Sequence, residues 1–82
     1  MKYFMNMDGT IIGENIRNLR KRNYLTQEEL AEKLGVSTMT IYRIENGVGN
    51  IKIQNLIMLA EIFGVDMHQL LKKGAVKDPK SA

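Results

Sequence analysis

Apolar residues recur along most of the chain at the three- and four-residue spacing of helices, and polar capping residues or glycines separate the apolar stretches. The only proline lies at position 79, beyond the last of these stretches. The pattern predicts an all-α fold, a compact bundle of about five helices. The expected helices span about residues 11–23, 27–34, 38–46, 53–63 and 67–72.

Capping residues mark the second and third helices most clearly. Thr26 and Glu29 have the spacing of a capping box, in which each side chain bonds the backbone amide of the other. Gly35 follows the last apolar residue of the second helix, a place where a left-handed residue commonly ends a helix. Ser37 is a favourable N-cap for the third helix, and Gly47 is placed to end it. These signals predict two short helices joined by a tight turn.

Polar residues also stand at the starts of the other helices. Asp8 or Thr10 can cap the first helix, and Asp66 with Gln69 opens the fifth. The loop before the fourth helix offers Asn50, which we expect to supply the cap of that helix.

The fourth helix carries more apolar residues than one face accommodates. One stripe at helical spacing is expected to face the core, and it comprises Ile53, Leu56, Ile57, Ala60 and Phe63. The apolar residues that lie partly off this stripe are Ile51, Met58, Leu59 and Ile62. A helix that is apolar over more than one stripe usually has a second buried surface. We therefore expect these four residues to lie on a second buried surface.

The 82 residues leave room for one domain with a modest core. We expect this domain at residues 10–73, after an N-terminal extension at 1–9 and before a disordered C-terminal tail at 74–82. The extension has no clear period. It is either loosely ordered, as chain ends usually are, or packed through its apolar residues.

Charge is unevenly distributed along the chain. Residues 1–71 carry equal numbers of cations and anions, so the net charge of +3 comes entirely from the residues after them. Four cations cluster at positions 17 and 20–22 of the first helix, whereas glutamates cluster on the second. A neutral body with one basic side can bind phosphates. The alternative is an ordinary solvated helix face.

Several classes of chemistry find no support in the sequence. The chain has no cysteine, which removes disulfides, thiolate zinc sites and cysteine nucleophiles and suits a cytoplasmic protein. His68 is the only histidine and is expected to be a surface residue, so we expect no metal site. No apolar run approaches the roughly 20 residues of a membrane span. Because no catalytic motif is present, we expect no enzyme activity, cofactor or small-molecule ligand.

A specific resemblance rests on residues in and after the two short helices, namely Gln27, Ala31, Gly35, Ile41 and Ile44, then IENG at 44–47 and LAEIFGVDMHQLL at 59–71. This set resembles the helix-turn-helix of the lambda-repressor/Cro type (XRE family) over roughly residues 11–71. The resemblance implies a lambda repressor-like DNA-binding domain that places helix 38–46 in the major groove. It also implies a homodimer on a palindromic operator, with half-sites about 34–36 Å apart.

Within this family, residues 47–65 are similar to the controller proteins of restriction–modification systems. A phage or mobile-element repressor and a housekeeping regulator are equally compatible with the sequence. A different class is a protein-interaction module or an antitoxin whose apolar helix-four surface binds a different protein.

The resemblance and the residue types suggest roles for individual side chains. The candidates for reading bases are Thr38, Met39, Thr40 and Arg43, of which Arg43 is the strongest because its guanidinium matches the O6/N7 pair of guanine. The candidates for phosphate contact are Gln27, Tyr42, Asn46, Arg17, Lys33 and Lys52. The alternative is that Thr38 only begins the helix and that Tyr42 and Arg43 are only solvated.

The resemblance implies two further contacts. Ile51, Met58, Leu59 and Ile62 would form the symmetric dimer interface. Arg20 and Glu45 would pair inside the domain and tie the first helix to the end of the third, the alternative being two independent surface charges.

Overall fold

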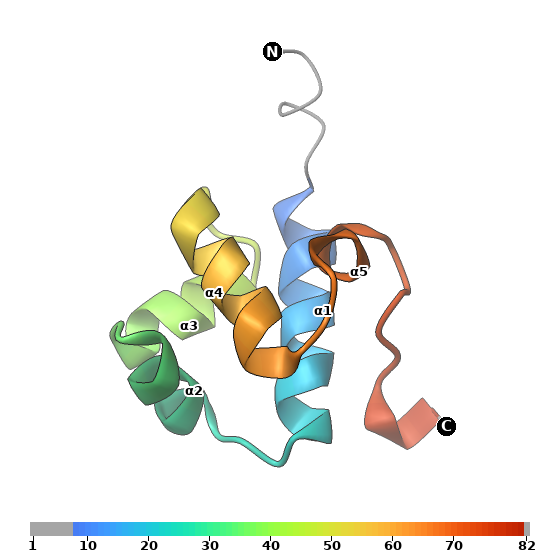
Figure 1. The fold of residues 1–82 in the computed structure, drawn as a ribbon, viewed down its shortest axis with the longest axis horizontal. Helices are drawn as coiled ribbons and strands as arrows, with labels where there is room; N and C mark the ends of the chain where they lie inside the picture. Colours follow the sequence, from blue (N-terminus) through green and yellow to red (C-terminus); the bar gives the residue numbers. More distant parts are fainter. Residues whose placement is uncertain (1–7, 82) are drawn as a thin grey trace.

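Helices account for nearly all of the regular structure in this computed structural model, which describes residues 8–81 (Figure 1). They are α1 (Gly9–Arg22), α2 (Gln27–Leu34), α3 (Thr38–Glu45), α4 (Ile53–Phe63), α5 (Met67–Leu71) and the 3₁₀ helix η2 (Pro79–Ser81). Each expected helix begins and ends within two residues of the observed one. The prediction of an all-α bundle is confirmed, since no strand occurs between residues 8 and 81.

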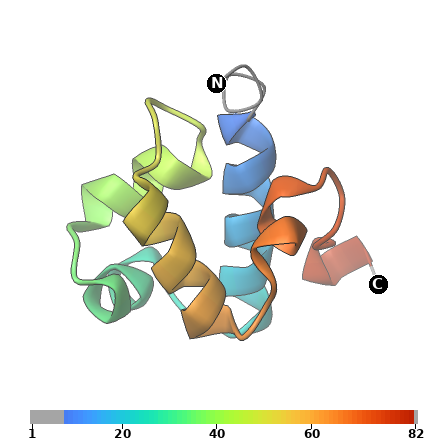
Figure 2. The same cartoon turned by 45° about the horizontal axis from the view of Figure 1, so that its top comes forward.

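Helix α1 runs through the middle of the bundle. Helix α3 packs on one side of it, and α5 and η2 pack on the other (Figure 2). Helix α2 contacts both α3 and α4, and α4 also contacts α5, so α4 lies between α2 and α5. The buried apolar side chains of all five α-helices, with one from the C-terminal segment, form a single core: Ile12, Ile16, Leu19, Leu30, Ala31, Leu34, Ile41, Ile44, Leu56, Leu59, Ala60, Leu70 and Val76.

The caps of α2 and α3 agree with the sequence prediction. The amide of Glu29 donates to the Thr26 hydroxyl at 3.0 Å, and the amide of Thr26 donates to the Glu29 carboxylate at 2.9 Å. The Thr26 amide, together with the Thr26 hydroxyl, lowers the pKa of Glu29 because both bonds favour the charged carboxylate. Gly35 has the left-handed φ of 76°, and Ser37 accepts from the amide of Thr40.

The predicted N-caps of α1 and α5 are confirmed, whereas that of α4 is wrong. Asp8 caps α1 by accepting from the amide of Thr10, and Asp66 forms a capping box with Gln69 at the start of α5. The cap expected from Asn50 is absent. Lys52 occupies the N-cap position of α4, and no side chain bonds the first amides of that helix.

The face of α4 that meets the core differs from the expected one. Ile53 and Ile57 are 59% and 43% exposed, whereas Leu59 is fully buried. The core-facing residues are therefore Leu56, Leu59, Ala60 and Phe63. Both possible stripes have helical spacing and both are apolar, so periodicity does not distinguish them. The assignment of Leu59 to a dimer interface is wrong, because its side chain packs inside its own domain.

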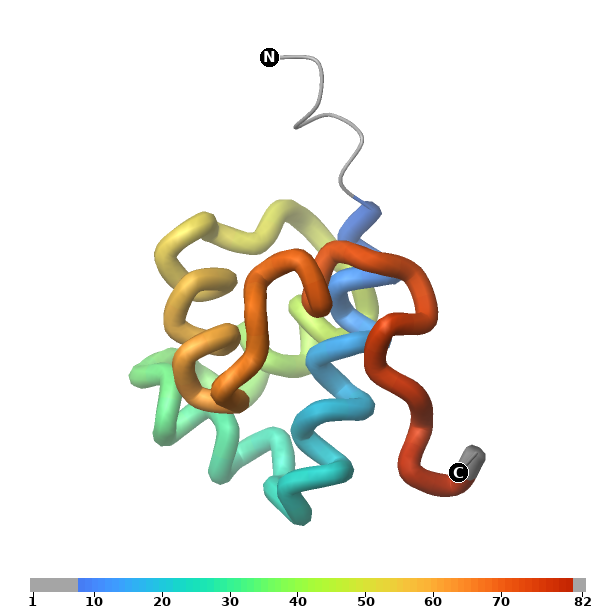
Figure 3. The backbone as a smooth tube through the Cα atoms, turned by 45° about the vertical axis from the view of Figure 1, so that its right-hand side comes forward, coloured from blue at the N-terminus to red at the C-terminus, as the bar shows by residue number. Residues whose placement is uncertain are grey.

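The C-terminal segment also differs from the expectation. Val76 is buried, and residues 74–81 run alongside α1 (Figure 3). Asn15 donates to the carbonyls of Gln69, Leu70 and Lys72 and accepts from the amide of Val76. Residues 74–81 thus pack on the domain, in place of the expected disordered tail. Of the expected N-terminal extension, residues 1–7 lie outside the described residues, and Gly9 already belongs to α1.

Helices α1 and α3 approach each other closely at Gly13. A Cβ atom at this position would lie 2.3 Å from the carbonyl oxygen of Ile44 and 2.6 Å from that of Glu45. Only glycine therefore fits at this crossing, and its cost in the middle of a helix is offset by the close approach of the two backbones. The crossing places the C-terminal end of α3 against α1.

Candidate nucleic-acid interface

The α2–turn–α3 unit presents one face of α3 to solvent. Ile41 and Ile44 point into the core, and the Glu45 side chain is buried as well. The opposite face is exposed and carries four of the predicted DNA-contacting residues, Thr38, Met39, Tyr42 and Arg43. Because the buried face fixes the rotation of α3, the exposed face has a defined position relative to the rest of the domain.

The candidate base-reading residues are not equally free. The Arg43 side chain forms no hydrogen bond or ion pair with any part of the chain from residue 8 to 81, so all five of its guanidinium N–H donors remain available. Met39 is 56% exposed and offers an apolar surface. Thr40 is half-buried, and its hydroxyl lies 3.0 Å from the hydroxyl of Ser37. Thr40 therefore contributes to the start of α3 as well as to its surface.

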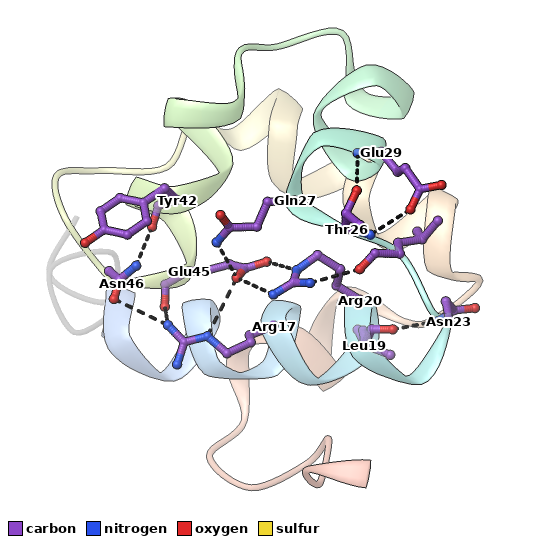
Figure 4. Close-up of polar contacts among 11 residues, drawn as sticks. Arg17, Leu19, Arg20, Asn23, Thr26, Gln27, Glu29, Tyr42, Glu45 and Asn46 are labelled. Carbon is purple, nitrogen blue, oxygen red and sulfur yellow. Dashed lines mark hydrogen bonds and ion pairs between the residues drawn. The ribbon is translucent and has the colours of Figure 1, made fainter.

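Arg20 and Glu45 form a buried ion pair, which is the pairing that the resemblance implied. The Arg20 side chain donates to both carboxylate oxygens of Glu45, and the Nη2–Oε1 distance is 3.1 Å (Figure 4). The Glu45 side chain is fully buried and that of Arg20 is 13% exposed. Arg20 also donates to the carbonyl of Leu25 just before α2. The pair thus connects α1 with both short helices.

Two predicted phosphate-contacting residues reach the same carboxylate. Gln27 donates from Nε2 to Oε1 of Glu45 at 3.1 Å, and Arg17 Nε lies 3.6 Å from the same oxygen. Arg17 also donates from Nη2 to the backbone carbonyl of Glu45 and to the Asn46 side chain, at 3.3 and 3.4 Å. The sequence reasoning missed this convergence. The three-residue spacing of Arg17 and Arg20, which places both on one helix face, was the available signal.

The other predicted phosphate-contacting residues lie farther along the same unit. Asn46 donates from Nδ2 to the carbonyl of Tyr42 at 2.8 Å, and the Tyr42 side chain is half-exposed. Lys33, in the last turn of α2, and Lys52, at the start of α4, are exposed, and their side chains form no hydrogen bond or ion pair among residues 8–81. The structure does not bring these two lysines together with Arg17 and Gln27.

Two hollows flank the C-terminal half of α3. One has a volume of 310 Å³ and lies between α3 and the loop before α4, where Arg43 and Lys52 are among its lining residues. The other, of 360 Å³, is lined by polar and charged side chains that include Arg17, Lys21 and Asn46 together with Asp78. Cations and amide groups are thus present on both sides of the exposed helix face.

The described residues show neither a metal centre nor a membrane-spanning helix. No group of three or more potential ligands among histidine, cysteine, aspartate and glutamate gathers within residues 8–81, and His68 is exposed. None of the helices in this part of the chain is long and apolar enough to cross a bilayer.

Two short helices joined by a tight turn, with one face of the second helix exposed beside polar and cationic side chains, define a helix-turn-helix protein. The helix-turn-helix family model matches residues 16–70, which is more than half of the chain. The chain therefore belongs to the helix-turn-helix family of DNA-binding transcriptional regulators.

Two individual proteins of known class are similar to this chain over most of its length. The chain is 34% identical over 68 residues to the control protein C.SmaI of Serratia marcescens, a match that covers 83% of this chain and 81% of that protein. It is 30% identical over 69 residues to the antitoxin PezA of Streptococcus pneumoniae, and there it spans 84% of its own length but only 44% of the antitoxin.

A solved structure of another controller protein is also similar to this chain. The crystal structure of the restriction–modification controller protein C.AhdI from Aeromonas hydrophila superimposes with a TM-score of 0.71 at 28% identity. The superposition covers 77% of this chain and 96% of that one. Nearly the whole length of that controller protein thus corresponds to the helical domain described here.

Proposed function

We propose that the protein is a sequence-specific transcriptional regulator that binds a palindromic double-stranded DNA operator as a homodimer, with α3 in the major groove. The observation that carries this proposal is the exposed face of α3, on which the Arg43 side chain has no hydrogen-bond or ion-pair partner among residues 8–81. A major groove about 12 Å wide admits an α-helix with its side chains. In this proposal the regulator represses or otherwise controls its own gene, and the similarity to two proteins named as control or controller proteins supports a regulatory role.

Recognition divides into reading and positioning. Arg43 donates to a guanine edge, while Thr38, Met39 and Thr40 contact neighbouring bases or thymine methyl groups. The phosphate contacts come from residues on α1, on α2, on α3 and its C-cap, and at the N-cap of α4: Gln27, Tyr42, Asn46, Arg17, Lys33 and Lys52. Loss of the Arg43 contact is expected to cost about 1–3 kcal/mol of binding free energy at the specific site.

The dimer forms through the exposed apolar surface of α4. Ile53, Ile57 and Met58 are each more than 40% exposed, and Ile51 and Ile62 are partly buried at the edges of the same surface. A second copy related by a two-fold axis covers these side chains and doubles the number of DNA contacts. Leu59, which is buried within the domain, contributes to this interface only by supporting the helix.

The test combines a mass measurement with DNA titrations. Light scattering gives the oligomeric state, and fluorescence anisotropy compares a duplex from upstream of the gene with a scrambled duplex at two salt concentrations. Arg43→Ala is compared with Lys77→Ala, which removes the same charge from the C-terminal segment. We expect a dimer that prefers the upstream duplex and loses this preference only in Arg43→Ala.

Two results would contradict the proposal. Equal loss of preference in both variants would show that Arg43 contributes only charge. A monomer that ignores DNA at both salt concentrations would instead favour a protein-interaction module or an antitoxin, in which the α4 surface binds a different protein. The match to the antitoxin PezA is the observation behind that second candidate.

A further inference from the structure

The carboxylate of Glu45 joins side chains from two other helices at one buried point. Its Oε1 atom lies 3.1 Å from Arg20 Nη2, 3.1 Å from Gln27 Nε2 and 3.6 Å from Arg17 Nε (Figure 4). Arg17 and Arg20 come from α1, Gln27 from the first turn of α2, and Glu45 from the last turn of α3. A fully buried carboxylate that is shared in this way fixes the relative positions of all three donors.

The two outer donors keep hydrogen atoms that Glu45 does not use. The Gln27 amide nitrogen carries two N–H groups and gives one to Glu45. Arg17 carries five N–H donors, and its Nη1 nitrogen has no partner among residues 8–81. Both side chains are only partly buried, so these remaining donors are accessible from outside. Two cations and one carboxylate also leave the cluster with a net positive charge.

Arg17 extends the cluster to Asn46. Its Nη2 nitrogen donates to the Asn46 side-chain oxygen, and Asn46 in turn donates to the carbonyl of Tyr42 in α3. The polar hollow of 360 Å³ is lined by Arg17, Asn46 and Glu45, so it lies directly over this chain of contacts. Glu14 and Asp78 on the rim of the hollow limit how many anionic groups can enter it.

We propose that Glu45 is a positioning residue that holds Arg17 and Gln27 as one preorganised phosphate-binding unit. The inference rests on the proposed DNA binding and adds that these two contacts are energetically coupled. Side chains that are already held in the bound geometry lose little conformational freedom when a phosphate arrives. Removal of either side chain loosens the shared carboxylate and weakens the contribution of the other.

A double-mutant cycle tests the coupling. The dissociation constants of the wild-type protein, Arg17→Ala, Gln27→Ala and the double variant are measured by anisotropy at one salt concentration. We expect the double variant to lose less affinity than the product of the two single losses, by about threefold or more. The control cycle pairs Arg17→Ala with Lys52→Ala, which lies beside the other hollow, and its losses are expected to multiply.

Phosphate contacts carry no sequence information, so the same coupling is expected on the upstream and the scrambled duplex. Melting temperatures are measured for every variant, and affinities are compared only among variants that are folded. Loss of folding therefore cannot account for the coupling. Glu45→Gln, which keeps the shape but removes the charge, is expected to abolish the coupling. The Arg17–Gln27 cycle remains decisive if that variant does not fold.

The outcomes separate the two proposals. A wild-type protein that binds neither duplex overturns the proposed function and this inference with it. A wild-type protein that binds DNA while the Arg17 and Gln27 losses simply multiply overturns the inference alone. Coupling that occurs on the upstream duplex but not on the scrambled one also overturns it, because that result would assign the two residues to base recognition.

Discussion

Substitution of Gly13 by alanine should destabilise the fold, although alanine is the better helix former. In an unobstructed helix the change would add about 1 kcal/mol of stability. Here the new methyl group would lie 2.3 Å from the Ile44 carbonyl oxygen and 2.6 Å from that of Glu45. The position of the methyl group is fixed by the α1 backbone and its neighbours are backbone oxygens, so no rotamer relieves the clash and α1 must move away from α3. Overpacking costs about 1–3 kcal/mol, and the upper end applies to a clash of this kind.

The expected net loss is about 2 kcal/mol, which corresponds to a fall in melting temperature of roughly 8–16 °C for a domain of this size. Urea unfolding and thermal melts followed by circular dichroism measure it. The control is Gly9→Ala in the first turn of the same helix, where the new atom would lie 3.5 Å from its nearest neighbour. If Gly13→Ala proves as stable as Gly9→Ala, the close crossing of α1 and α3 is wrong.

Four other residues give sharp expectations. Glu45→Ala should cost about 3–5 kcal/mol because it leaves the buried Arg20 unpaired, while the exposed Glu28→Ala should stay within about 0.5 kcal/mol, and equal melting temperatures would contradict this. Asn15→Ala should speed amide hydrogen exchange in residues 74–81, and exchange rates equal to those of the wild-type protein would contradict the packing of this segment. Tyr24 has a left-handed φ of 57° and its side chain is 93% exposed, so Tyr24→Gly should raise the free energy of unfolding, measured in urea, by about 1 kcal/mol. A lower free energy of unfolding would show that the backbone of Tyr24 is not strained. Glu29 has a lowered pKa, so its contribution to stability is complete above its ordinary pKa of 4.5 and is lost as the pH falls through the lowered pKa. A Glu29→Gln variant whose stability falls with acid as much as that of the wild-type protein would contradict this.

Local signals in the sequence were sufficient for the helices and for most of their caps. The Thr26–Glu29 capping box, the left-handed Gly35 and the N-cap Ser37 each depend on residues within one turn of one another. Short-range hydrogen bonds of this kind follow from residue type and spacing alone. The cap of α4 is the exception, because Asn50 has the right side chain but the helix begins beyond its reach, after Lys52.

The rotation of α4 and the path of the C-terminal segment could not be predicted in the same way. Both apolar stripes of α4 have helical spacing, and the choice between Ile57 and Leu59 for the core depends on how α2 and α5 meet the helix. The C-terminal segment is held by Asn15 and Asn18, whose partner Val76 lies about sixty residues later in the chain. Asparagines within an apolar helix face were the visible signal, because buried amides need partners.

In the candidate site too, some features follow from local sequence patterns and others depend on tertiary contacts. The contact between Gly13 and the end of α3 explains the features that could not be predicted. The exposed face of α3 follows from its periodicity, whereas the shared carboxylate follows from the crossing at Gly13. Gly13, Arg17 and Arg20 lie at i, i+4 and i+7, on one face of α1. Because the backbone at Gly13 touches the end of α3, the next two turns of α1 carry Arg17 and Arg20 to Glu45. A missing side chain at one position thus sets the geometry of the cations on the following turns, and a methyl group there should weaken DNA binding as well as folding.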